Sequence, residues 1–208
     1  MELRLNNGLL EVRLESFGAE LVGLRDLENN REYMWQKDSK FWAKCSPILF
    51  PFVGAIKDNR YFYAGKEYQI TTKHGFARDY EFKVSSQDDT SIEFLFESNE
   101  ETLKIYPFNF KLYLKYILNG KKLRMEYRVE NLGDKKMYFS LGAHPAFATP
   151  VGENIDYSDY YIEFEKEESG EVKVLNGALI NSKKVEKVFE GKKLVLTKDR
   201  FKNDALII

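Results

Sequence analysis

The chain has 208 residues, of which 43% are apolar and 31% are charged, and its formal net charge is -1. This balance excludes a strongly basic nucleic-acid binder and a protein drawn to anionic membranes by its charge. The length suits one large all-β domain, and the aromatic content of 15% favours strands, whose pleated surfaces accommodate rings. We therefore expect residues 1–208 to form a single domain.

The only cysteine is Cys45, so an intramolecular disulfide and a cysteine metal cluster are both excluded. We expect Cys45 to be a small buried residue. The first residues alternate in polarity and carry charges, unlike a signal peptide, and no apolar run has the length of a membrane span. The sequence therefore predicts a cytoplasmic protein without a membrane partner.

Alternation of apolar and polar residues, the period of a half-buried strand, recurs along the chain. It begins at residues 10–14, and residues 60–70 predict a hairpin that turns at Ala64-Gly65-Lys66. Strands follow at 80–85 and 91–96, and residues 98–103 predict one or two helical turns. Further strands are predicted at residues 136–141, 159–165, 171–175, 192–197 and from 205 onward.

The most regular alternation lies between residues 111 and 130 and predicts a long hairpin with one buried face. Apolar side chains share that face along both strands, and charged side chains occupy the other face of the second strand. Asn119-Gly120 is the expected two-residue turn, because both residues tolerate a positive φ. Short strands at regular spacing, separated by turn signals, predict an all-β fold, a large antiparallel β-sandwich.

Two apolar segments interrupt the alternation. Residues 46–54, SPILFPFVG, and residues 142–150, GAHPAFATP, each contain two prolines, which remove hydrogen-bond donors from a ladder. We predict packed loops for both, and loops are where functional groups concentrate. The two histidines of the chain, His74 and His144, each lie beside a glycine in loop-like sequence.

Four segments, taken in order, resemble the aldose 1-epimerase (galactose mutarotase) family, most closely its LacX-like branch and the related hexose-6-phosphate mutarotases. They are SPILFPFVG at 46–54, RYFYAGKEYQI at 60–70, KHGFARDYEF at 73–82 and SLGAHPAF at 140–147. Each segment is a weak signal alone, but their order on a β-rich background is specific. The resemblance implies a galactose mutarotase-like supersandwich that binds a small-molecule sugar and uses no cofactor.

The resemblance also implies an isomerase that interconverts the α and β anomers of a hexose through the open-chain aldehyde. A general acid protonates the ring oxygen while a general base removes the proton of the C1 hydroxyl, so two proton-transfer groups flank one carbon. By the family pattern His144 is the acid, His74 binds the sugar, and Arg78 is a contact for an anionic substrate. Arg60, at the start of the first hairpin, is a further substrate-binding candidate.

The sequence departs from the family pattern at two places. Ala55 follows Val53-Gly54, where family members often have an arginine. The family places its catalytic glutamate near the C-terminus, past several further strands, and no glutamate of this chain matches it. We therefore expect the chain to lack its C-terminal strands, to be inactive as it stands, and to expose sheet edges that favour a homodimer.

Two alternative functions stay open. A hexose-6-phosphate mutarotase would need basic residues near the site, for which the candidates are Arg78, Arg60, Lys57 and Lys73. A non-catalytic carbohydrate-binding domain could use the same sandwich; the unmatched glutamate favours it and the presence of His144 opposes it. A metal site on the two histidines lacks a patterned third ligand, so we expect none.

Overall fold

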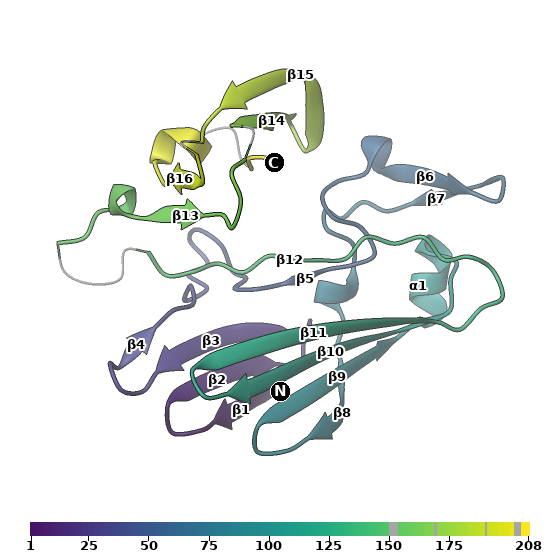
Figure 1. The fold of residues 1–208 in the computed structure, drawn as a ribbon. Helices are drawn as coiled ribbons and strands as arrows, with labels where there is room; N and C mark the ends of the chain where they lie inside the picture. The colour runs from purple at the N-terminus through teal and green to yellow at the C-terminus, as the bar shows by residue number, and fades with distance from the viewer. Residues whose placement is uncertain (150–153, 169, 190, 202–204) are drawn as a thin grey trace. The chain divides into compact units, whose positions relative to one another are not determined.

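The computed structural model describes residues 1–149, 154–168, 170–189, 191–201 and 205–208 (Figure 1). Its contacts divide the chain into two compact units, Met1–Ala148 and Thr149–Ile208, and each is treated by itself below. The expectation of a single domain stays a prediction. Among the described residues, no helix has the length and apolarity that crossing a membrane requires.

The first unit contains a four-stranded antiparallel sheet near the N-terminus. Its strands, in spatial order, are β1 (Glu2–Asn6), β2 (Leu10–Glu15), β3 (Glu20–Asp26) and β4 (Arg31–Glu32). The alternation predicted at residues 10–14 is confirmed, because Leu10, Val12 and Leu14 are buried and the residues between them are half-buried. One face of β2 therefore packs into the core.

A second four-stranded antiparallel sheet has the spatial order β11-β10-β9-β8. Its strands are β8 (Lys83–Gln87), β9 (Ser91–Glu97), β10 (Phe110–Asn119) and β11 (Lys122–Asn131). The predicted long hairpin is confirmed, but its turn is Gly120-Lys121, one residue later than expected, since Asn119 pairs with Lys122. Gly120 has a φ of 55°, and glycine at the first central position is the type II′ pattern.

The short elements around this sheet follow the sequence closely. Residues 98–103 lead into a helix, α1 (Glu100–Ile105), whose N-terminus is capped by the Asn99 side chain. The predicted strand at 80–85 begins only at Lys83, because Glu81 instead forms an isolated bridge with Phe17 of the N-terminal region. The strand predicted at 91–96 is confirmed as β9.

Apolar side chains from both four-stranded sheets join one core. The Tyr116 hydroxyl on β10 donates a hydrogen bond of 2.7 Å to the carbonyl of Ala19, which precedes β3. Large side chains that are almost completely buried are Phe50, Phe82, Phe94, Phe110, Tyr106 and Tyr116. The predicted antiparallel β-sandwich is therefore confirmed, and Cys45 is buried as expected.

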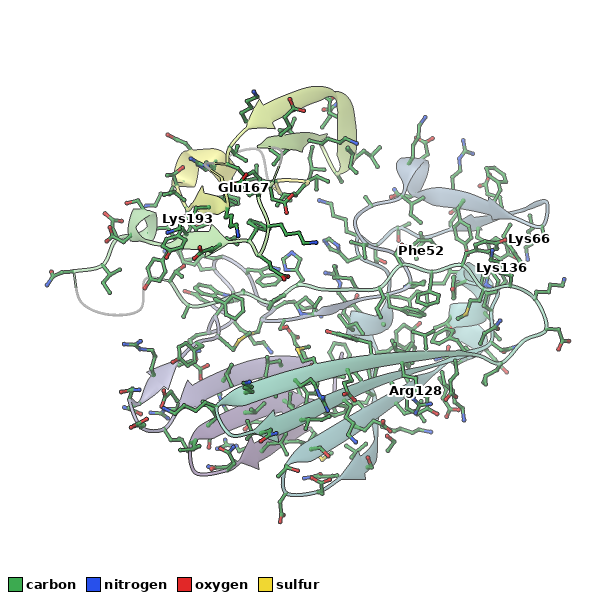
Figure 2. The ribbon with its side chains drawn as sticks, in the orientation of Figure 1. Phe52, Lys66, Arg128, Lys136, Glu167 and Lys193 are labelled. Atoms are coloured by element: carbon green, nitrogen blue, oxygen red, sulfur yellow. The ribbon has the colours of Figure 1, made fainter. Side chains whose placement is uncertain are left out.

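The prediction for residues 60–70 is confirmed as a separate hairpin, β6 (Arg60–Tyr63) and β7 (Lys66–Gln69). A short 3-10 helix, η1 (Lys57–Asn59), precedes it. The turn is Ala64-Gly65, both with positive φ, and Lys66 already belongs to the strand. Phe52, which Figure 2 labels, packs against Tyr61 of β6 with ring centroids 5.3 Å apart.

The described residues of the second unit contain two two-stranded sheets. β13 (Tyr161–Glu163) pairs with β16 (Lys193–Val195), and β14 (Glu171–Asn176) pairs with β15 (Leu179–Lys187). The strands predicted at 159–165 and 192–197 exist but are shorter, and residues 157–159 and 198–201 form the 3-10 helices η3 (Tyr157–Asp159) and η4 (Lys198–Phe201). From residue 205 onward the structure has one bridge, Lys173 to Ile207, in place of the predicted strand.

Candidate functional site

The two proline-containing segments lie side by side in the first unit. β5 (Ile48–Leu49) and β12 (Gly142–Ala143) form a two-residue antiparallel ladder. Single bonds continue its register on both sides: the backbone N–H groups of Ser140, His144 and Ala146 donate to the carbonyls of Pro51, Pro47 and Cys45. The prolines accept bonds but cannot donate them, so the pairing is extended while the ladder stays short.

This pairing corrects the prediction for the second segment. Residues 136–141 are not a strand, and the regular pairing begins at Gly142, where a loop was expected. The physical reason is the partner: the donors that would extend the ladder are missing at Pro47 and Pro51. Pro150, the last residue of the predicted loop, lies outside the described residues.

Residues 74–79, the histidine segment, lie against residues 45–54, the central segment. The carbonyl of Phe50 accepts the backbone N–H groups of Phe76 and Ala77 at 3.0 and 3.1 Å. Gly75 forms a parallel bridge with Phe50, has a φ of 72°, and would place a Cβ atom 2.1 Å from the Phe50 carbonyl oxygen. Glycine is therefore required at position 75, both for its backbone conformation and for the close approach.

His74 is fixed by two hydrogen bonds to Gly54. Its backbone N–H donates to the Gly54 carbonyl at 2.7 Å, and its Nδ1 accepts the Gly54 N–H at 3.1 Å. A nitrogen that accepts a hydrogen bond carries no proton, so the neutral ring holds its proton at Nε2. His74 also has a φ of 68°, an uncommon conformation for a non-glycine residue, which the two bonds maintain.

The two histidine rings meet. The imidazoles of His74 and His144 have centroids 5.5 Å apart and cross at 62°. His74 is half-buried, whereas His144 is exposed. Residues 70 positions apart in the chain are thus brought together by the central segment, which pairs with both of their loops. The two predicted site histidines therefore lie beside each other.

An aromatic residue that the sequence analysis missed completes this cluster. The Trp42 ring lies 5.0 Å from the His144 ring, centroid to centroid, and is half-buried. Its backbone carbonyl accepts the indole N–H of Trp35 at 2.9 Å, which fixes the loop that carries it. No spacing in the sequence connects Trp42 with His144.

A buried carboxylate supports the beginning of the central segment. The Glu20 side chain accepts the backbone N–H groups of Cys45 and Ser46 at 2.5 and 2.9 Å, and only 3% of Glu20 is exposed. Through these two bonds Glu20 positions the segment that both histidine loops contact.

Cys45 itself is not a nucleophile. Burial raises the pKa of its thiol to about 12, so the thiol stays protonated.

Arg78 and a neighbouring lysine form a basic group on the histidine segment. Arg78 lies in the 3-10 helix η2 (Ala77–Asp79), and its Nε is 3.7 Å from the Asp79 carboxylate. That Nε is buried and lacks a hydrogen-bond acceptor in the described structure. The Lys44 Nζ donates to the Arg78 carbonyl at 3.1 Å and to Asp79 at 3.0 Å. Two cations and one carboxylate leave this cluster with a local positive charge.

Arg60, the remaining predicted site residue, lies in a different environment from the two histidines. It opens β6 and pairs with Glu67 of β7 at 3.3 Å as an exposed cross-strand ion pair. Such pairs contribute little to stability. The structure thus brings His74 and His144 together, keeps Arg78 on the same segment as His74, and engages Arg60 within the β6–β7 hairpin. Groups of three or more His, Cys, Asp or Glu suited to a metal ion are absent from the described residues.

Comparisons with known proteins concern the chain as a whole. A sequence profile described as Aldose 1-epimerase matches residues 1–204. The plasmid and chromosomal LacX proteins of Lactococcus lactis subsp. lactis are 37% and 36% identical over 174 residues, which are 81% of this chain. The chain spans 58% of the length of these curated relatives.

Solved structures show the same fold. A galactose mutarotase related enzyme from Lactobacillus acidophilus is similar with a TM-score of 0.93 and 32% identity, over 99% of this chain and 68% of that one. A galactose mutarotase-like protein from Lactobacillus casei is similar with a TM-score of 0.89 and 34% identity, over 99% of this chain and 71% of that one. The match over almost the whole chain decides the assignment: this protein belongs to the aldose 1-epimerase family.

Proposed function

We propose that this protein is an aldose 1-epimerase that interconverts the α and β anomers of a hexose at the site of His74 and His144. The observation that carries the proposal is the ring contact between these histidines, whose centroids are 5.5 Å apart. Anomer exchange by ring opening needs proton transfer at the ring oxygen and at the C1 hydroxyl. Histidine is suited to this task, because its ordinary pKa is near neutral pH.

The two histidines take different roles in this proposal. His144 is exposed and acts as the general acid that protonates the ring oxygen. His74 is held through Nδ1, so its Nε2–H acts as a hydrogen-bond donor to a sugar hydroxyl. Trp42, beside His144, offers an apolar face on which the sugar ring can stack. The structure supports this division through the fixed ring of His74 and the accessible ring of His144.

The reaction also needs a base for the C1 hydroxyl. The family pattern supplies a glutamate for it, and no glutamate of this chain matches that motif. A single positioned proton-transfer group contributes roughly 10²–10⁴-fold to a rate, so the acid alone gives part of the full acceleration. We therefore expect this chain to be inactive apart from the small acceleration that His144 alone supplies, well below the rate of a complete acid–base pair.

A specific observation favours a second substrate class, a hexose 6-phosphate. Arg78 has a buried Nε without a hydrogen-bond acceptor among the described residues, and Lys44 is bonded to the same helix. An arginine and a lysine together are typical of a phosphate site. Arg60, on the neighbouring hairpin, is a weaker candidate for this contact, since Glu67 already pairs with it.

Polarimetry on the 208-residue chain tests the proposal. Fresh α-galactose, α-glucose and α-glucose 6-phosphate are each followed to anomeric equilibrium, with and without protein. We expect acceleration that His144→Ala removes and that Phe62→Ala, at an exposed ring on β6, leaves unchanged. Arg78→Ala should weaken only the reaction of the phosphate if the second substrate class is correct.

Isothermal titration with the same sugars separates catalysis from binding. Binding without acceleration would contradict the epimerase and favour a non-catalytic carbohydrate-binding domain. If the chain neither binds a sugar nor accelerates its equilibration, both functions are wrong for this protein.

A further inference from the structure

The strand β11 is the edge of the second sheet within the part of the chain that the structure describes. It is ten residues long and pairs with β10 on one side (Figure 1). An edge strand of this length presents a row of backbone donors and acceptors that can pair with another strand. Its sequence decides which strand fits.

The backbone N–H and C=O groups of β11 point towards β10 at even-numbered residues and towards the open edge at odd-numbered residues. The Leu118 N–H donates to Thr90 on the β9 side, and the Leu132 N–H donates to Asn109. In an antiparallel hairpin, Leu132 and the even-numbered residues 122–130 therefore bond to β10. The odd-numbered residues 123–131 direct their N–H and C=O groups to the open edge. A partner strand must consequently place its own outward groups opposite odd residues.

The side chains of β11 divide in the same way. The even-numbered residues from Lys122 to Arg128 are exposed, whereas the odd-numbered ones from Leu123 to Val129 are half-buried and pack against the core. The outer face carries, in order, Lys122, Arg124, Glu126, Arg128 and Glu130. One face is thus charged and the other apolar, so a partner strand must match both.

We propose that a second copy of the chain pairs through β11, antiparallel, with the twofold axis at Tyr127. In this register Arg124 lies opposite the Glu130 of the other copy, and Glu126 lies opposite its Arg128. The symmetry generates each pair twice, which gives four ion pairs between the strands. On the apolar face Tyr127 meets its own copy and Met125 meets Val129. The two sheets then join into one continuous sheet.

The neighbouring registers fail on charge. Moving the axis by one residue to Glu126 sets Arg124 opposite Arg128 and Glu126 opposite itself. Moving it to Arg128 sets Glu126 opposite Glu130. Like charges directly opposite each other destabilise a pair of strands, and an axis between residues would oppose outward and inward backbone groups. Charge complementarity therefore selects the axis at Tyr127.

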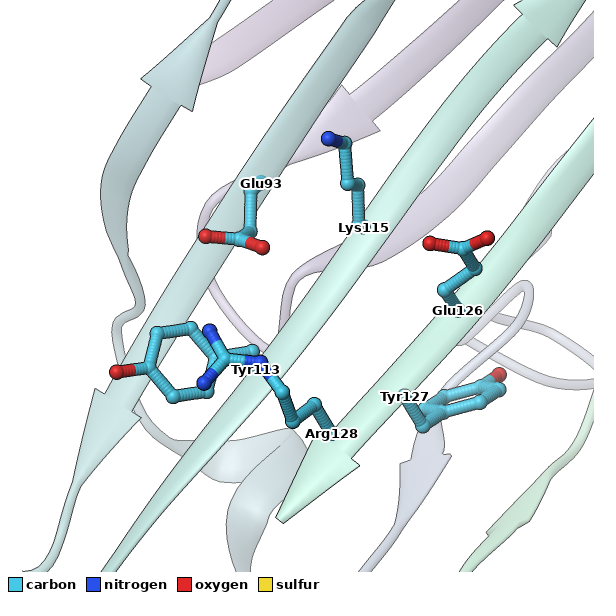
Figure 3. A pocket seen from close by; sticks show the side chains of 6 residues that line it. All are labelled: Glu93, Tyr113, Lys115, Glu126, Tyr127 and Arg128. Carbon is cyan, nitrogen blue, oxygen red and sulfur yellow. The ribbon is translucent and has the colours of Figure 1, made fainter. Parts of the chain in front are cut away.

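The side chains that would form these pairs already stand on the outer face. Figure 3 shows Glu126 and Arg128 on β11, with the Arg128 guanidinium over the Tyr113 ring, 3.4 Å from its centroid. Within one chain Arg124 contacts Glu126, and Arg128 contacts Glu130, two residues along the strand. These exposed contacts contribute little and can be exchanged for pairs across the strands.

Sedimentation velocity on the 208-residue chain tests the proposal. We expect a concentration-dependent species with twice the 24.4 kDa mass of the chain. Arg124→Glu/Arg128→Glu makes the outer face of β11 acidic, and Glu126→Arg/Glu130→Arg makes it basic. Each variant alone should be monomeric, and an equimolar mixture should restore the dimer. A wild-type monomer at all concentrations, or a dimer that persists in both variants, overturns the proposal.

A cross-linking experiment tests the register itself. Tyr127→Cys places two Cα atoms about 5.5 Å apart across the axis, within the range of a disulfide. Met125→Cys is the matched control, because its copies lie about 13 Å apart along the strands. Cys45 is buried and does not interfere. We expect oxidation to cross-link Tyr127→Cys alone, and Met125→Cys only when it is mixed with Val129→Cys.

The mixed pair also decides the question if Tyr127→Cys does not fold. Cross-linking of Met125→Cys with itself would show a different register and contradict the axis at Tyr127. Absence of cross-links in the mixture of Met125→Cys and Val129→Cys would contradict pairing through β11 altogether. Another protein captured by this edge, with the chain itself monomeric, would equally overturn the proposal.

Discussion

Residues 1–148 and residues 149–208 are both built from alternating strands, yet they differ in what the alternation buries. In the first unit, apolar side chains from two four-stranded sheets form one core. In the second unit, the described apolar side chains that are buried are Val172, Val174 and Leu194. A period of two therefore specifies a strand in both units, but a core needs a facing layer of comparable width.

The largest expected difference in stability is between the loss of a buried side chain in the first unit and the loss of an exposed one in the second. Phe110→Ala removes a completely buried ring of the first unit and should lower the free energy of unfolding by about 3–5 kcal/mol. Ile180→Ala, at a side chain of the second unit that is 55% exposed, should change it by less than about 0.5 kcal/mol. Urea unfolding measures both. Equal losses would show that the comparison of burial is wrong.

Gly75 in the first unit and Gly177 in the second both have a positive φ, but they differ in the space around them. Gly75→Ala would push a Cβ atom into the Phe50 carbonyl, so strain and overpacking together should cost more than about 2 kcal/mol. Gly177, in the turn between β14 and β15, has a φ of 60° and open space around it. Gly177→Ala should cost only about 1 kcal/mol, from backbone strain alone. Thermal unfolding of the two variants checks this order.

Two carboxylates that accept backbone N–H groups differ in burial. Glu20→Gln keeps an acceptor for Cys45 and Ser46 but removes the charge, and should cost about 1 kcal/mol. Asp159 of the second unit accepts the Asp156 N–H at 2.8 Å while exposed. Asp159→Asn should change stability by less than about 0.5 kcal/mol. If Asp159→Asn lost more stability than Glu20→Gln, burial would not determine how strongly such a carboxylate stabilises the fold.

The smallest expected effect is a change in folding stability at acidic pH. Asp88, in the turn before β9, accepts hydrogen bonds from the backbone and side chains of Thr90 and Ser91, which lower its pKa to about 2. Because this pKa is below the ordinary value near 3.9, the ionised form favours the folded state. The contribution is complete above about pH 5 and is lost progressively as the pH falls through the folded-state pKa near 2. The difference in melting temperature between the wild type and Asp88→Asn should shrink over that range.

The sequence predicted those parts of the fold that depend on neighbours in the chain. The hairpin of β10 and β11 was readable because its alternation is regular, and the turn was misplaced by one residue because Asn119, Gly120 and Lys121 all suit a turn. The missing strand at 136–141 depended on a partner with prolines, which local alternation cannot reveal. Local patterns therefore gave the elements, and the pairing of distant segments corrected them.

The candidate site divides in the same way. His74 and His144 were identified through the family resemblance, and their ring contact required the fold. Trp42 and Glu20 were missed, because an aromatic loop residue and an acidic residue at a strand end have no distinctive spacing. Their roles depend on which loops the central segment brings together. Prediction of such supporting residues needs the three-dimensional contacts.

The most direct test of the proposed sugar site uses the fact that the chain has only two histidines. In a ring-labelled sample, NMR would record two imidazole spin systems, which His74→Ala assigns by removing one of them. We expect both to shift on titration with galactose and to give the same dissociation constant, because one ligand contacts both rings. If saturating sugar shifted neither imidazole, or shifted one alone, His74 and His144 would not form a common sugar site.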